Sequence, residues 1–194
     1  MSSILVTHAS RYGGTQGIAE RIAVTLTACG HQAEAWPIGG PRDLAGYDAF
    51  IIGSGVYMGS WLKEARDFVR HHREILATRP VWLFSSGPLG SAKLDAKGRD
   101  PLTAAEPKEV AEFSESLSPR EHRVFFGALD PARIGLPARL MRKLPAGRNL
   151  LVAGDFRDWE KIEEWAEGIA RELDPVTAGS ARSGGPSDTG TVGP

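Results

Sequence analysis

The residues best suited to ligand chemistry lie near the N-terminus, in the segment Ser10-Arg11-Tyr12-Gly13-Gly14-Thr15-Gln16. An apolar run at residues 4–9 precedes this segment, and a helical pattern of apolar residues follows it. A strand that enters a helix through such a loop directs backbone N–H groups and the positive helix end at one point. The hydroxyl groups add donors, and the two glycines let the backbone approach a ligand closely. The segment therefore predicts a phosphate-binding site.

Two further loops have a similar composition. One reads GSGVYMGSW from residue 53 and the other reads SSGPLGSAK from residue 85. Glycine-rich loops with aromatic residues suit a flat ring system whose polar edge is met by main-chain groups, although glycine after a strand can also be a simple turn former. Trp61 either covers such a ring or begins the apolar face of the next helix. The candidate ring-binding residues are Gly55, Val56, Tyr57, Met58, Gly59, Ser85, Ser86 and Gly87.

Strand-like and helix-like segments alternate along the chain, which is typical of a doubly wound α/β fold with a parallel sheet. We expect strand order 2-1-3-4-5 with helices on both faces, because this order brings the three loops together where the strand order reverses. The expected strands cover residues 4–9, 32–38, 49–54, 81–85 and 123–129. The first expected helix has Ile18, Ile22 and Leu26 on its buried face and ends at Gly30, and the others lie at 43–45, 62–76, 107–117 and 159–173.

Composition narrows the class of protein. A net charge of −1 over 194 residues does not favour nucleic-acid binding. A single cysteine, Cys29, excludes an internal disulfide bond and is expected to be buried. Only three residues precede the first strand and no apolar run reaches the ~20 residues of a membrane span, so we expect a cytoplasmic protein.

Several site classes are disfavoured by the motifs. The chain lacks the GxGxxG and GxxxxGK[ST] patterns of dinucleotide and nucleoside triphosphate sites, and the ends of the first and third strands lack the acidic cluster of a receiver domain. No metal site is expected, because the adjacent His71 and His72 point in different directions on a helix. His31 and His122 flank strands and are expected to be exposed, whereas His8 ends the first strand beside the phosphate loop.

The phosphate loop resembles the (T/S)-x-(T/S)-G-x-T motif of flavodoxin-like FMN proteins. It matches at Ser10, Gly13 and Thr15, and it departs at Tyr12, where the backbone N–H can still serve. Within that group the chain looks most similar to the branch of menaquinone-dependent protoporphyrinogen IX dehydrogenases. Three segments carry this likeness: residues 53–59, the ending Phe126-Gly127-Ala128-Leu129-Asp130, and Asp155-Phe156-Arg157-Asp158-Trp159 before the last helix.

The resemblance implies FMN as cofactor, with its phosphate on Ser10 to Gln16 and its ring system framed by residues 55–59 and 85–87. It also implies an oxidoreductase whose chemistry is mostly that of the flavin, with a quinone or a porphyrinogen as redox partner. No catalytic residue is identified. Two alternatives stay open, a flavodoxin-type electron carrier and a flavodoxin-like interaction domain without cofactor.

Two segments interrupt the regular pattern. Residues 131–158 form an insertion in the domain, which we place at residues 1–173. The part at 131–148 is basic and amphipathic with no acidic residue. It is either a lid that faces substrate or the inner face of a membrane, or a solvated segment on the sheet edge. Residues 174–194 are rich in Gly, Ser, Thr and Pro and are expected to be disordered.

Overall fold

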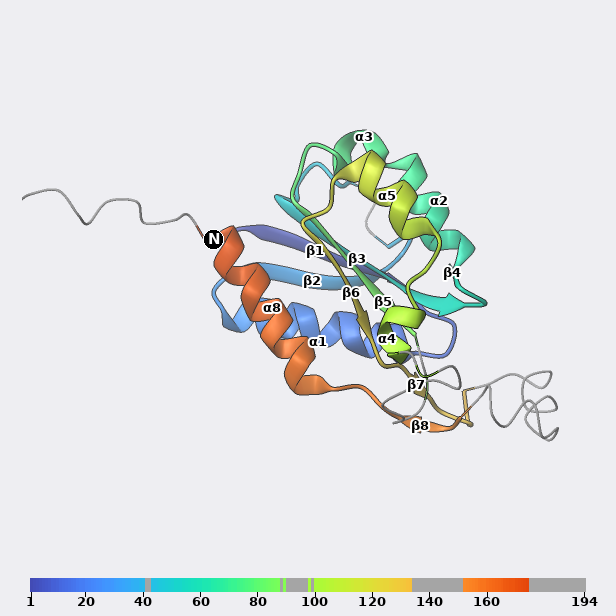
Figure 1. Cartoon of the computed structure of the whole chain (residues 1–194). Helices are drawn as coiled ribbons and strands as arrows, with labels where there is room; N and C mark the ends of the chain where they lie inside the picture. The colour runs from blue at the N-terminus through green and yellow to red at the C-terminus, as the bar shows by residue number, and fades with distance from the viewer. Residues whose placement is uncertain (41–42, 88, 90–97, 99, 134–151, 175–194) are drawn as a thin grey trace, which may run out of the picture.

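The computed structural model describes residues 1–40, 43–87, 89, 98, 100–133 and 152–174. Within these residues five strands form a parallel sheet in the order β2-β1-β3-β5-β6, which confirms the predicted order (Figure 1). The strands are β1 (Ser3–Ala9), β2 (Gln32–Pro37), β3 (Ala49–Tyr57), β5 (Val81–Ser86) and β6 (Glu121–Phe125). A short antiparallel strand, β4 (Ser60–Trp61), pairs with the end of β3.

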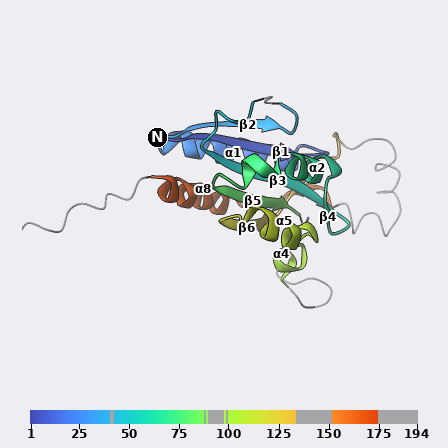
Figure 2. The ribbon, with the colours of Figure 1, turned by 90° about the horizontal axis from the view of Figure 1, so that it is seen from above.

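The central strands are apolar because both of their faces are covered by helices. On one face lie α1 (Gly14–Ala28) and α8 (Trp159–Leu173), and on the other lie α2 (Lys63–His71), α3 (Arg73–Leu76) and α5 (Glu109–Leu117), as Figures 1 and 2 show. A short helix, α4 (Pro101–Ala104), precedes α5. One core cluster packs the sheet against α1 and α8, and a second packs it against α2, α3 and α5.

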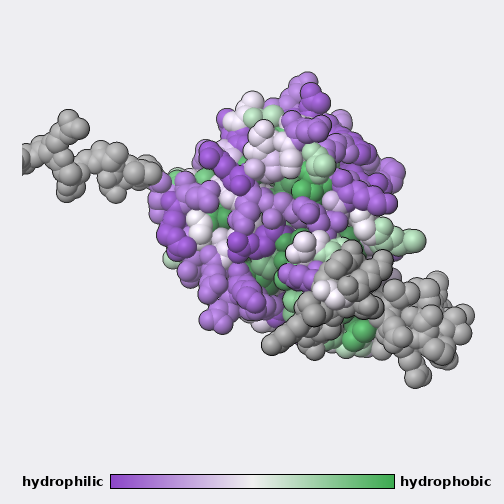
Figure 3. Space-filling view, in the orientation of Figure 1, coloured by the Kyte–Doolittle hydropathy of each residue, from purple (hydrophilic) through white to green (hydrophobic). Residues whose placement is uncertain are grey.

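The helix boundaries follow from local sequence signals. α8 begins after Asp158, whose carboxylate accepts the backbone N–H of Lys161 at 3.2 Å, the usual role of Asp at the N-cap of a helix. α1 ends just before Gly30, as the sequence indicates. On the visible face of the molecule, hydrophilic residues cover most of the surface and hydrophobic residues appear only in small patches between elements (Figure 3).

Three predicted elements differ in the structure. The fifth strand does not run from 123 to 129. Because β5 ends at Ser86, its pairing with β6 stops at Phe125. The chain then forms a separate strand, β7 (Ala128–Leu129), which pairs antiparallel with β8 (Gly154–Asp155). The helix predicted over 62–76 is divided at His72, where the backbone leaves helical geometry.

The third difference is the helix expected around 43–45. The carboxylate of Asp43 instead accepts the N–H of Ala45 at 2.8 Å, which makes a turn of the kind that Asp favours. Cys29 was predicted to be buried and is exposed, because it lies at the C-cap of α1, beyond the face that packs on the sheet. The expected disorder of the tail and most of the 131–158 insertion fall outside the described residues.

Candidate functional site

The predicted phosphate loop connects the carboxyl end of β1 to the start of α1. Gly13 is the N-cap residue of α1 and has a φ of 86°, a conformation in which a residue with a Cβ is strained. Its N–H donates to the Ser10 hydroxyl at 3.0 Å, which closes the loop. No described side chain caps α1 and its first turn holds no acidic residue. The first N–H groups of α1 are therefore available to an anion.

A cavity of about 420 Å³ begins at this loop. Its lining is mostly apolar, and it contains no charged side chain among the described residues. This volume lies within the roughly 300–1,000 Å³ range of small-molecule pockets. Three predicted loops contribute to the lining, together with residues from α4, from the segment after β6 and from β7. The lining residues are Ser10, Tyr12, Gly14, Thr15, Gly55, Val56, Tyr57, Met58, Gly59, Ser86, Gly87, Leu89, Ala104, Ala105, Gly127, Ala128 and Leu129.

The remaining predicted residues lie around the cavity. The guanidinium of Arg11 stacks over the Tyr57 ring, 4.8 Å from its centroid. Gly13 and Gln16 line a second cleft on the outer side of the loop. Ser85 is fully buried beneath the lining.

The β3–β4 hairpin forms one wall of the cavity. It turns through Met58 and Gly59, which both have positive φ values, 52° and 74°. Two consecutive residues of this kind make the type I′ turn that matches the twist of a hairpin. The N–H of Lys108 donates to the Gly59 carbonyl at 3.1 Å and ties the hairpin to the start of α5. Met58 is completely exposed at the rim.

Tyr57 is the aromatic residue of this wall. Its ring lies close to Gly55, where a Cβ would meet the ring at 3.0 Å, and it contacts Tyr12 edge-on at a centroid distance of 6.3 Å. Burial, reinforced by Tyr12 and opposed by Arg11, raises the pKa of Tyr57 to about 12. The phenol therefore stays neutral and can donate a hydrogen bond at physiological pH.

Below the cavity, Trp61 is buried rather than available to cover a ligand ring, since its exposed fraction is 2 %. Its indole N–H donates to the Ser85 hydroxyl at 2.7 Å, and Ser85 in turn hydrogen-bonds His122 Nε2 at 2.9 Å. The prediction that His122 is exposed was wrong, as its side chain is 9 % exposed. Burial lowers the pKa of His122 to about 4, with Glu121 opposing the shift. His31 was also expected to be exposed and is buried.

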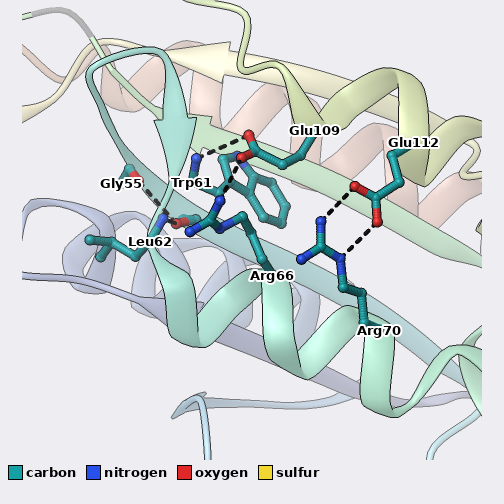
Figure 4. A network of polar contacts seen from close by, with 8 residues as sticks. Gly55, Trp61, Leu62, Arg66, Arg70, Glu109 and Glu112 are labelled. Atoms are coloured by element: carbon teal, nitrogen blue, oxygen red, sulfur yellow. Dashed lines mark hydrogen bonds and ion pairs between the residues drawn. The ribbon is translucent and has the colours of Figure 1, made fainter.

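A network of charged residues supports the hairpin from outside the cavity (Figure 4). Glu109, at the start of α5, is buried and accepts the Trp61 backbone N–H at 3.2 Å. Its other oxygen pairs with Arg66 of α2 at 3.3 Å. One turn further along, Glu112 and Arg70 form an exposed pair with two hydrogen bonds of 2.7–2.8 Å. The network joins α2, α5 and the β4 end of the hairpin.

Two arginines that sequence reasoning did not place at the site lie against the phosphate loop. Arg157 donates to the Gly14 carbonyl at 3.3 Å and stacks on Trp159, with its guanidinium 4.3 Å from the ring centroid. The Arg133 guanidinium lies beside Gly13, where a Cβ would come within 2.3 Å of Nη1. Both line the second cleft, which has a volume of about 700 Å³. Two features of the sequence could have drawn attention to Arg133. Asp130-Pro131 favours a turn just before it, and residues 131–148 are basic.

Other chemistry has little support in the described part of the chain. No three metal-ligating side chains converge there, and none of its helices has the length and apolar character needed to traverse a lipid bilayer. His8 is buried at the end of β1 with its Nδ1 unpartnered, and burial lowers its pKa.

Comparisons with known proteins agree with this geometry. Oxidised Flavodoxin 2 from Bacillus cereus has a TM-score of 0.57 and 24 % identity, with 88 % of this chain and 99 % of that chain covered. A mutant of flavodoxin from Pseudomonas aeruginosa has a TM-score of 0.54 and 18 % identity, with 89 % and 99 % covered. At these identities the likeness shows the fold.

A third solved structure is longer than this chain. Rubredoxin oxygen:oxidoreductase from Desulfovibrio gigas has a TM-score of 0.54 and 13 % identity over 88 % of this chain, which spans only 36 % of that protein. No curated protein sequence matches the chain. A family model described as a flavodoxin domain matches residues 5–146, well over half of the chain. The order of the parallel strands, the loop at the start of α1 and this match together lead to one conclusion: the chain belongs to the flavodoxin domain family.

Proposed function

We propose that this protein binds FMN and acts as an oxidoreductase. The observation that carries the proposal is the continuity between an anion-ready loop at the start of α1 and an apolar cavity at the carboxyl ends of β3 and β5. FMN has a matching form, because it joins a phosphate to a flat aromatic ring system through a polar chain. The match to the flavodoxin domain family supports the same cofactor.

The residues present fit FMN at both ends. The hydroxyl groups of Ser10 and Thr15 and the first N–H groups of α1 would hold the phosphate. Tyr57 and the hairpin on one side, with Ser86 and Gly87 on the other, would hold the ring system. Bound FMN would supply the ability to accept and return two electrons. The protein would orient the ring, limit water around it and present neutral donors such as the Tyr57 hydroxyl.

The resemblance of residues 53–59, 126–130 and 155–159 to protoporphyrinogen IX dehydrogenases suggests the partners. We propose that the donor is a porphyrinogen or another reduced small molecule and that the acceptor is a quinone. The alternative of an electron carrier shares the cofactor and differs in its partners. An interaction domain without cofactor shares neither, so FMN binding is the first property to measure.

The binding experiment uses quenching of FMN fluorescence in a titration with the purified protein. We expect saturable one-to-one binding by the wild type. Replacing Ser10 by Ala removes a hydroxyl from the phosphate loop and should weaken binding about tenfold, the scale of a hydrogen bond to a charged group. Thr25→Ala, at the far end of α1, removes a hydroxyl that bonds the Arg21 carbonyl and serves as the control. A wild-type protein that does not bind FMN would contradict the proposal.

Turnover separates an enzyme from a carrier. The FMN-loaded protein is mixed anaerobically with protoporphyrinogen and menadione, and porphyrin fluorescence is followed. Catalytic formation of porphyrin supports the proposed substrate class. Reduction of FMN by a protein partner with no turnover of either small molecule supports the carrier.

We also propose that the basic segment at 131–148 brings the protein to an anionic membrane that holds the quinone. Most of this segment lies outside the described residues, so its sequence carries the argument. Each basic residue near such a surface contributes about 1 kcal/mol. Co-sedimentation with anionic liposomes should be lost when Arg139, Arg142 and Lys143 are replaced by Gln. Equal sedimentation of both proteins would reject this proposal.

A further inference from the structure

Arg133 reaches the phosphate loop through a turn that its own neighbours build. The Arg133 N–H donates to the Asp130 carbonyl at 3.0 Å, and the Asp130 carboxylate accepts the N–H of Ala132 at 2.8 Å. Asp at the first position and Pro at the second are the residues that such a turn favours. The turn follows β7 directly, and β7 packs against Gly14, so the side chain of Arg133 is delivered to the start of α1.

The guanidinium group of Arg133 is held against the N-cap residue of α1. A Cβ at Gly13 would lie 2.3 Å from Nη1, so glycine at this position leaves room for the arginine. The cation is thus placed at the positive end of the helix, where it would be unfavourable unless an anion were also bound there. Its side chain is 62 % exposed, which leaves the guanidinium accessible to a ligand.

Three arginines line the cleft on the outer side of the loop, and two of them have close carboxylate partners. Arg157 is bonded to Asp155 at 2.6 Å, and Arg21 is bonded to Glu163 at 2.6 Å. Within the described residues, the carboxylate that pairs with Arg133 is that of Asp130, at the long distance of 3.9 Å. Of the three, Arg133 therefore carries the positive charge that is least neutralised.

We propose that Arg133 binds the phosphate of the cofactor and selects phosphorylated over unphosphorylated flavin. This inference rests on the proposed FMN site. A planar guanidinium donates two parallel hydrogen bonds to a phosphate and also brings a positive charge. The backbone N–H groups of the loop donate hydrogen bonds but are neutral. Riboflavin has the same ring system and lacks the phosphate, so it gains nothing from Arg133.

The test compares FMN with riboflavin on the same proteins. Dissociation constants are measured by flavin fluorescence for the wild type, Arg133→Ala and Arg133→Lys. We expect Arg133→Ala to bind FMN about tenfold more weakly than the wild type. This loss is at the low end of the range for hydrogen bonds to charged groups, because the Arg133 side chain is exposed. Riboflavin binding should be unchanged, and Arg133→Lys should retain only part of the affinity for FMN, because it keeps the charge and loses the two parallel hydrogen bonds.

Arg21→Ala is the matched control, since it removes a cation from the same cleft that is already paired with Glu163. It should leave the preference for FMN over riboflavin intact. Equal binding of FMN by the wild type and Arg133→Ala would overturn the role of Arg133 alone. Equal loss of FMN and riboflavin would also overturn it, because Arg133 would then only shape the loop. Failure of the wild type to bind either flavin would instead reject the proposed function.

Discussion

At the scale of single residues, Met58 holds a backbone conformation that its type disfavours. A left-handed conformation costs a residue with a Cβ roughly 1–2 kcal/mol, and Asn tolerates it better than Met. The Met58 side chain is fully exposed, so replacing it sacrifices no packing. Strain retained at such a place is typical of a functional rim.

We therefore expect Met58→Asn to raise the free energy of unfolding by about 0.5–1 kcal/mol. Urea denaturation of the wild type and the variant provides the measurement. Met58→Ala keeps the Cβ and removes the rest of the side chain, so it should leave stability nearly unchanged. If Met58→Ala and Met58→Asn stabilised the protein equally, the exposed Met58 side chain, rather than the backbone conformation, would be the source of the destabilisation.

His122 makes the stability of the fold depend on pH. Burial lowers its pKa from 6.5 in the unfolded chain to about 4, so the unfolded state binds more protons between these values. Stability should be greatest above pH 6.5 and should fall by roughly 3 kcal/mol as the pH decreases to about 4. Burial also lowers the pKa of His8, which contributes with the same sign.

Urea denaturation between pH 4.5 and 7.5 checks this expectation. His122→Gln should flatten most of the dependence, and the remainder comes from His8 and His72, whose pKa values are also lowered by burial. If the stability of the wild type and of His122→Gln changed with pH in the same way, His122 would not be the source of the pH dependence.

At the scale of elements, one buried carboxylate, that of Glu109, joins α2 and α5 to the hairpin through polar contacts. Removing Glu109 leaves the Trp61 N–H and Arg66 without their acceptor in a buried setting. We expect Glu109→Ala to destabilise the protein by about 2–3 kcal/mol. Glu112→Ala breaks the neighbouring exposed pair and should have a much smaller effect. Similar losses from both variants in denaturant unfolding would refute the special role of Glu109.

The elements themselves could be predicted largely from sequence, and their long-range partners could not. Apolar runs located all five parallel strands, because these signals are local. The hydrogen bonds that link Trp61, Ser85 and His122 were not predicted. These residues are far apart in sequence and meet only because β5 lies between β3 and β6. Likewise, nothing near Gly13 signals that Arg133 will lie against it.

At the scale of the whole molecule, a ligand that binds only the folded state adds to its stability. FMN at 100 times its dissociation constant should contribute about 2.7 kcal/mol, which corresponds to a rise in the melting temperature of about 5–10 °C for a domain of this size. Thermal unfolding followed by far-UV circular dichroism, with and without FMN, provides the measurement. An unchanged melting temperature under saturating FMN would contradict binding at the α1 loop.

The contacts of the phosphate loop with Ala128 and Arg157 also bear on the order of events during synthesis. The loop is synthesised before the residues that brace it, because Ala128 and Arg157 come more than a hundred residues later in the chain. A nascent chain that ends before residue 127 lacks part of the cavity lining, which includes Gly127, Ala128 and Leu129. On the proposed function, such an unfinished polypeptide cannot yet hold the flavin.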